Sequence, residues 1–177
     1  MITKLKTLFN PLAFSNENTL EDFQVYYEET KDFVRASIYW MIRSHHVDDL
    51  VQETYLKAWK SFKSFESKAS FKTWIYRIAM NVTYDFLRKK TNDLNIDDYQ
   101  LVDTSKDDLT NEDLISKALL KLNENQREVF ILFYKFGYTT IEIAELIEIK
   151  EGTVKSRLHY AKESFVEFVK EDGVQNG

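Results

Sequence analysis

Residues 139–158 read TTIEIAELIEIKEGTVKSRL, and this stretch decides the fold. Thr139 followed by Glu142 forms a capping box, the sequence signature of a helix start. Apolar residues then recur at helical spacing, a short polar turn follows, and a last helix begins near Glu151. The small Ala144 allows the two helices to cross closely. Two helices joined by a tight turn are typical of a helix-turn-helix.

The last helix has two chemically different faces. With Val154 at zero on a wheel of about 100° per residue, Leu158, Ala161 and Phe165 fall within about 40° of it. The remaining surface offers hydroxyl, imidazole and basic groups: Thr153, Lys155, Ser156, Arg157, His159 and Tyr160. A recognition helix presents such groups to base edges and phosphates. The alternative is a solvated helix face.

The segments before this pair also have helical periodicity. Asn123 with Gln126 is a second capping box, and the apolar run after it ends at Gly137, a natural helix end. Further upstream, apolar residues recur every three or four positions, which predicts helices over about 20–42, 47–62 and 70–90. Only four glycines and one proline occur in 177 residues, too few turn formers for a sheet-rich fold. We expect an all-α protein.

The charge is distributed very unevenly along the chain. The net charge is −5, but residues 54–90 carry nine basic and two acidic side chains (+7), and residues 91–113 carry one basic and eight acidic (−7). The acidic stretch loses apolar periodicity, so we interpret 91–110 as a linker between two small helical domains, 1–90 and 111–177. The basic stretch suits a polyanion. Alternatively, both charge blocks are solvated surface.

Aromatic and amide side chains lie among the cations of the basic stretch. The predicted second helix carries Lys57, Lys60 and Lys63 on one side, and a polar connection around Phe65 follows. The third helix faces them with Lys72, Trp74, Tyr76, Arg77 and Asn81. Bases stack on rings while lysines follow the backbone, as single-stranded nucleic acid requires. Phe65 and the Asn81 amide could receive an unstacked base.

Three motifs in this order resemble the extracytoplasmic-function (ECF) sigma factors, compact bacterial members of the sigma-70 family. Residues 49–53, DLVQE, are similar to region 2.2. Residues 71–81, FKTWIYRIAMN, running on to DFLR at 85–88, resemble regions 2.3 and 2.4. EIAE at 142–145 with EGTVKSRL at 151–158 resembles region 4.2. The match covers about residues 20–170.

The resemblance implies a protein that binds core RNA polymerase and directs it to promoter DNA. Domain 1–90 would bind the minus-10 element through Lys57, Lys60, Phe65, Lys68, Lys72, Trp74, Arg77, Asn81 and Arg88. Domain 111–177 would bind the minus-35 element through the polar residues of the last helix. Asp49, Gln52 and Glu53 would contact the clamp helices of the polymerase. The linker would enter the product channel, and an anti-sigma factor would supply control; no catalysis, cofactor or metal is implied.

The chain departs from the pattern of this family at three positions. Glu148 stands where a glycine is usual, Lys150 replaces a serine cap, and Tyr160 replaces a common arginine. If the turn needs a positive φ, Glu148 costs about 1 kcal/mol relative to glycine. These departures bear on which DNA sequence is preferred.

Two other functions remain open from the residues alone. His45 and His46 with Asp48 and Asp49 offer metal-ligand types for an enzyme, but the spacing does not match HExxH and adjacent histidines diverge on a helix. A stand-alone helix-turn-helix repressor would explain only 114–170. The chain has no cysteine, no apolar run approaching a membrane span and a poor signal peptide, so we expect a cytoplasmic protein.

Overall fold

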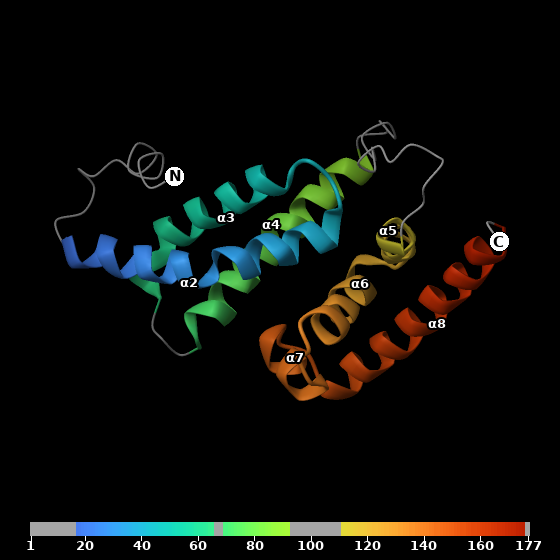
Figure 1. The fold of residues 1–177 in the computed structure, drawn as a ribbon. Coiled ribbons are helices and arrows are strands. Elements are labelled where there is room, and N and C mark those ends of the chain that lie inside the picture. Colours follow the sequence, from blue (N-terminus) through green and yellow to red (C-terminus); the bar gives the residue numbers. More distant parts are fainter. Residues whose placement is uncertain (1–16, 66–68, 93–110, 176–177) are drawn as a thin grey trace.

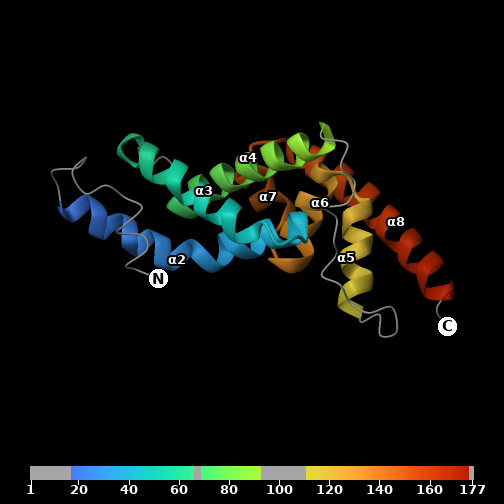
Figure 2. The same cartoon turned by 90° about the horizontal axis from the view of Figure 1, so that it is seen from above.

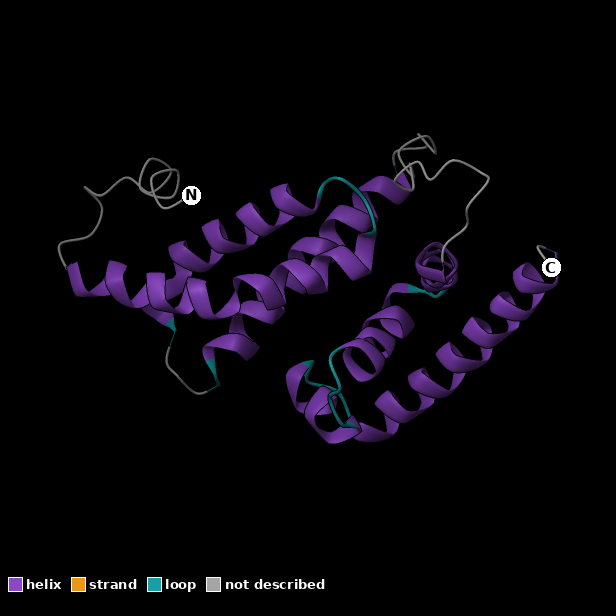
Figure 3. Ribbon diagram, viewed as in Figure 1, coloured by secondary structure: helices purple, strands orange, loops and turns teal. Residues whose placement is uncertain are grey.

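The computed structural model describes residues 17–65, 69–92 and 111–175, and within these ranges every regular element is a helix (Figure 3). The expected all-α fold is therefore confirmed. The predicted acidic linker and Lys68 lie outside the described residues.

The first module is a three-helix bundle. It contains α2 (Glu17–Ile42), α3 (Val47–Ser61), the short 3-10 turn η2 (Phe62–Ser64) and α4 (Phe71–Asn92). Each of the three long helices packs against the other two (Figure 1). Their apolar faces meet around Val34, Ile38, Ile75 and Ala79, which are fully buried. The periodicity of the sequence thus places its apolar residues in one core.

Local signals set the ends of these helices. Asp48 and Asp49 occupy the first turn of α3, where the helix dipole favours negative charge. At the start of α4, the Ser70 hydroxyl accepts a hydrogen bond from the Thr73 N–H at 3.1 Å. After α2 the backbone turns at Arg43, whose φ of 47° lies in the left-handed region.

The second module contains the helix-turn-helix. Its elements are α5 (Asn111–Lys121), α6 (Glu124–Phe130), the π-helical turn η4 (Ile131–Lys135), α7 (Thr140–Leu146) and α8 (Glu151–Gln175). Both predicted capping boxes are present, at Asn123 and at Thr139. Gly137 ends the apolar helix with a φ of 73°. The turn between α7 and α8 contains Glu148 at a φ of 56°. The turn therefore has the positive φ whose cost the sequence analysis considered.

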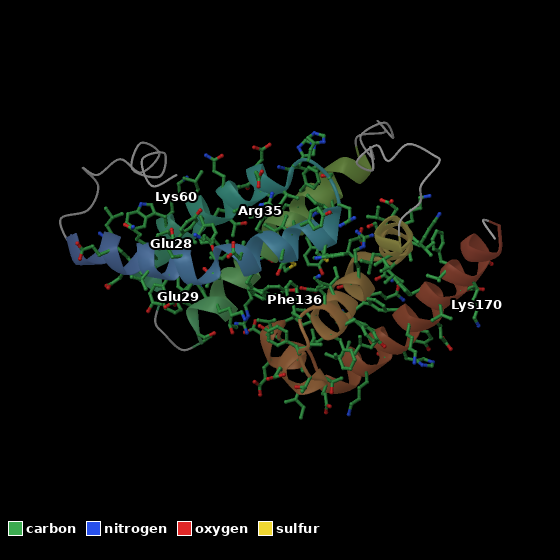
Figure 4. All side chains as sticks on the ribbon, viewed as in Figure 1. Glu28, Glu29, Arg35, Lys60, Phe136 and Lys170 are labelled. Atoms are coloured by element: carbon green, nitrogen blue, oxygen red, sulfur yellow. The ribbon has the colours of Figure 1, made fainter. Side chains whose placement is uncertain are left out.

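The two modules pack against each other. In Figures 1 and 2, α6 and α7 lie beside α2 and α4, and α2 also contacts α5 and η4. Phe136, labelled in Figure 4, lies at this junction with its ring 5.1 Å from that of Phe33 in α2. Residues on the facing sides of both modules are therefore engaged within the chain.

Candidate nucleic-acid interface

One face of α4 gathers four of the residues predicted to bind DNA. Trp74, Asn81 and Arg88 recur every seven residues, and Arg77 lies at the edge of the same face, so we call these four the α4 strip. Asn81 is exposed, and the Arg88 side chain is 70% exposed and pairs with Asp85. The strip combines a ring, an amide and two guanidinium groups along one side of a rigid helix.

An aromatic cluster adjoins the N-terminal end of this strip. Phe65, half-buried just after η2, lies 5.0 Å from the Trp74 ring and 5.6 Å from the Phe71 ring. Tyr26 stacks on Phe71 at 4.3 Å. Phe65 therefore has a packing role in the module in addition to any contact with a base, and Trp74 extends the aromatic surface onto the strip.

The outer face of α3 carries two other predicted sets in succession. Asp49, Gln52 and Glu53 are exposed in its first half, and Lys57 and Lys60 are exposed in its second half. Lys57 Nζ lies 2.9 Å from Glu53 Oε1, with both side chains about half exposed, 47% and 50%. Such a surface pair is weak. The lysine therefore remains accessible to a stronger anionic partner.

Two residues of α4 lie apart from the strip, toward the module junction. Lys72 Nζ is 4.2 Å from the centroid of the Phe33 ring and 5.4 Å from that of Tyr138. Tyr76 is 2% exposed. The expectation that Tyr76 faces nucleic acid was wrong, because its ring is buried and its hydroxyl donates to Glu128 of α6.

Arg77 is held by the end of α7. Its Nε donates to the carbonyl of Leu146 at 2.9 Å, and its Nη2 donates to the carbonyl of Glu145 at 2.9 Å. Its Nη1 lies 2.8 Å from the carboxylate of Glu148. Carbonyls at a helix C-terminus carry the negative end of the dipole and attract a cation. All three guanidinium nitrogens of this strip residue therefore have a partner in the second module.

The predicted recognition surface of α8 faces solvent over its first turns. Lys155 pairs with Glu151 at 2.8 Å, the Ser156 hydroxyl donates to the Thr153 carbonyl at 3.0 Å, and His159 Nε2 lies 3.5 Å from Glu163. Tyr160 is 58% exposed, whereas Thr153 and Arg157 are half-buried. The polar face is therefore accessible, with Arg157 set back from it.

Two adjacent charged residues of α6, Arg127 and Glu128, lie at the centre of the module junction. The sequence analysis did not predict a role for either of them. Glu128 Oε1 accepts a hydrogen bond from Tyr76 at 3.0 Å, and Oε2 accepts one from Tyr84 at 2.7 Å. The available signal was two adjacent charges directly before the apolar run that begins at Val129, because a charge that such a run carries into the interior requires dedicated partners.

Burial controls the protonation of this cluster. It raises the pKa of Glu128 above its ordinary value of 4.5, and the tyrosine hydrogen bonds and the charge of Arg157 in α8 offset this only in part. Burial, followed by the charge of Glu128, also raises the pKa of Tyr76 and Tyr84 well above 10.0. Both hydroxyls therefore remain protonated donors at neutral pH.

Replacing Glu128 by glutamine should change how stability depends on pH. Because the pKa of Glu128 is higher in the folded chain, the folded state binds the proton more tightly, and this contribution is lost as pH rises through the folded pKa. Relative to Glu128→Gln, the wild-type chain should therefore lose free energy of unfolding as pH rises from about 4.5 toward 8. Urea unfolding across this range measures the difference. Glu167→Gln, which changes an exposed carboxyl on α8, is the control. If the difference in free energy of unfolding between wild type and Glu128→Gln does not change with pH, the raised pKa of Glu128 is contradicted.

The proposed metal-ligand group does not assemble. The rings of His45 and His46 lie against each other at 4.1 Å, and His46 lies 5.1 Å from Phe86. Among the residues that the structure describes, no three His, Asp or Glu side chains come together in a way that could hold a metal ion. Within the same residues, no helix has the length and apolar character to cross a membrane.

A helix-turn-helix joined to a helical module with a basic and aromatic strip defines a DNA-binding protein, and comparison with known proteins gives its family. Residues 26–92 match sigma-70 region 2, and residues 112–165 match sigma-70 region 4. The ECF RNA polymerase sigma factor SigW of Bacillus subtilis is 32% identical over 152 residues, 76% of this chain and 81% of that protein. SigX of the same organism is 29% identical over 153 residues, 78% of this chain and 79% of that protein.

A solved structure has the same arrangement. The sigma factor RpoE of Bartonella quintana, in complex with the anti-sigma factor NepR, superposes with a TM-score of 0.68 at 28% identity, covering 85% of this chain and 98% of that one. The chain belongs to the ECF sigma factors of the sigma-70 family, and it acts with RNA polymerase in transcription initiation. The resemblance of its three motifs is thereby confirmed.

Proposed function

We propose that this sigma factor divides promoter recognition between its modules, residues 1–90 acting on the minus-10 element and residues 111–177 on the minus-35 element. The observation that carries the proposal is the α4 strip, which places the half-buried Trp74 and the exposed Asn81 and Arg88 on one face beside an aromatic cluster. In this proposal the acidic segment 91–110 spans the product channel of the polymerase.

Opening of the minus-10 element would proceed by capture of an unstacked base. Trp74 and Phe65 offer rings for stacking, and the Asn81 amide can both donate to and accept from a base edge. The positive charge that follows the phosphates would come from Lys57, Lys60, Lys68, Lys72, Arg77 and Arg88. Unstacking costs a few kcal/mol, which ring stacking and edge hydrogen bonds offset. The protein would thereby favour the melted strand without a catalytic group.

The exposed face of α8 would read the minus-35 element in the major groove. Ser156 and His159 present hydrogen-bonding groups at its centre, and Lys155 and Tyr160 flank them. The flanking cation and hydroxyl would contact phosphates, and such contacts position the helix on the DNA. The central groups would contact base edges, and such contacts specify the DNA sequence. Thr153 and Arg157, both half-buried, would support the helix from the side.

Two protein partners follow from the same proposal. The exposed Asp49, Gln52 and Glu53 of α3 would contact the clamp helices of core RNA polymerase. An anti-sigma factor is the second expected partner, supported by the complex in which the Bartonella relative was solved.

Reconstitution with bacterial core RNA polymerase tests the proposed function. The purified chain should bind core polymerase in a one-to-one ratio, and the reconstituted enzyme should transcribe a new, sequence-specific subset of a promoter library. Alignment of the selected promoters would give both recognition elements. Tight binding of the chain alone to duplex DNA, without polymerase binding, would favour a simple repressor.

A further inference from the structure

We infer that Glu148 makes the helix-turn-helix an internal competitor for nucleic acid, occupying Arg77 through a contact that must break before the α4 strip can bind DNA. The inference rests on the proposed function of the strip. It adds a regulatory contact between the two modules, formed by residues of this chain alone.

The geometry around Arg77 satisfies the whole guanidinium group. Two nitrogens donate to the carbonyls of Glu145 and Leu146, each at 2.9 Å, and the third lies 2.8 Å from the Glu148 carboxylate. Carbonyl oxygens and a carboxylate offer the acceptors that a phosphate would otherwise supply to the planar fork of an arginine. Arg77 therefore has no nitrogen without a partner while α7 stays in place.

The backbone at Glu148 gives an independent reason to assign this role. Its φ of 56° lies in the left-handed region, which side chains with a Cβ rarely occupy and which glycine adopts without strain. The turn itself therefore does not require a glutamate. The Glu148 carboxylate lies 2.8 Å from Arg77 Nη1, and this ion pair across the junction accounts for a glutamate at this position.

The contact is suited to release because it is accessible to solvent. The Arg77 side chain is 31% exposed and that of Glu148 is 69% exposed, so solvent and salt weaken their attraction. A nucleic acid strand carries many phosphates and can replace one carboxylate. The internal contact would thus suppress weak, non-specific binding while leaving strong promoter binding possible.

Removal of the carboxylate tests the inference in the full chain. Because the chain has no cysteine, Glu29→Cys in α2 and Lys170→Cys in α8 allow a fluorescence energy-transfer pair to be placed on the two modules. Glu148→Ala and Glu148→Gly both lose the carboxylate but differ in backbone strain. Glu145→Ala is the matched control, because it loses a carboxylate three residues earlier, in the last turn of α7, and retains its carbonyl contact to Arg77.

Both Glu148 variants should raise affinity for a fluorescent oligothymidine about two- to fivefold, the factor expected for an exposed ion pair. At a sub-saturating oligothymidine concentration they should therefore show lower transfer efficiency than the wild-type chain. Glu145→Ala should do neither, and the Glu148 effect on affinity should vanish in an Arg77→Ala background. Unchanged transfer in both Glu148 variants would overturn the inference. So would lower transfer without an increase in affinity. If Arg77→Ala by itself leaves oligothymidine affinity unchanged, Arg77 does not bind nucleic acid. This result would contradict the proposed function of the α4 strip and not the Glu148 contact.

Discussion

Replacing Arg127 by methionine should lower the free energy of unfolding by about 3–5 kcal/mol. Arg127 is 4% exposed, and its guanidinium group donates to four backbone carbonyls. Three of these belong to the end of α5 and its following turn, and the fourth is the carbonyl of Met41 in the last turn of α2, at 2.5 Å. Methionine fills similar volume but donates to none of these carbonyls, and of the four the Leu119 carbonyl keeps the Leu122 N–H at 3.1 Å.

The size of this effect follows from the position of the charge. The C-terminal ends of α2 and α5 both direct their negative dipoles at Arg127, so one cation neutralises two helix ends in different modules. Urea unfolding of the full chain measures the loss. Arg88→Met, the same change at a side chain that is 70% exposed, is the control and should stay within about 0.5 kcal/mol of wild type. A loss below about 1 kcal/mol for Arg127→Met would show that the carbonyls find other donors.

Local signals in the sequence were sufficient for most of the fold. The capping boxes at Asn123 and Thr139 are both present, and the helices begin and end within a few residues of their predicted bounds. Hydrogen bonds between a cap residue and its third neighbour depend on nearby residues alone, so their pattern can be read directly. The positive φ at Glu148 was only a conditional expectation from the sequence, and the structure supplies its value of 56°.

Packing between the modules could not be predicted from such local signals in the sequence. Tyr76 was expected to face nucleic acid, yet its ring is buried at the module junction, where its hydroxyl donates to Glu128, 52 residues away. Arg77 likewise contacts residues 68 to 69 positions later in the chain. Contacts at such separations leave no periodic pattern in the sequence. Adjacent charges next to an apolar run, such as Arg127 and Glu128, indicate only that a partner exists.

Replacing Trp74 by alanine should reduce promoter opening by the reconstituted holoenzyme about five- to 150-fold, because stacking of one base on a ring contributes about 1–3 kcal/mol. Trp74 is the aromatic member of the α4 strip and lies between the Phe65 cluster and Asn81 along the helix. A fluorescent base in the minus-10 element reports opening directly. Trp74→Phe retains a stacking surface and should recover a large part of the activity.

A different result is expected if Trp74 acts mainly by packing in the module. The same variants distinguish this packing role from base stacking. Its ring packs 5.3 Å from Phe71, whose side chain belongs to the core of the first module. If packing were its main contribution, Trp74→Ala would lower the melting temperature and polymerase binding together with promoter opening. If base stacking dominates, polymerase binding stays near wild type while opening falls. Since Trp74 is half-buried and Phe71 is 5% exposed, we expect Phe71 to hold the module together and Trp74 to act on DNA.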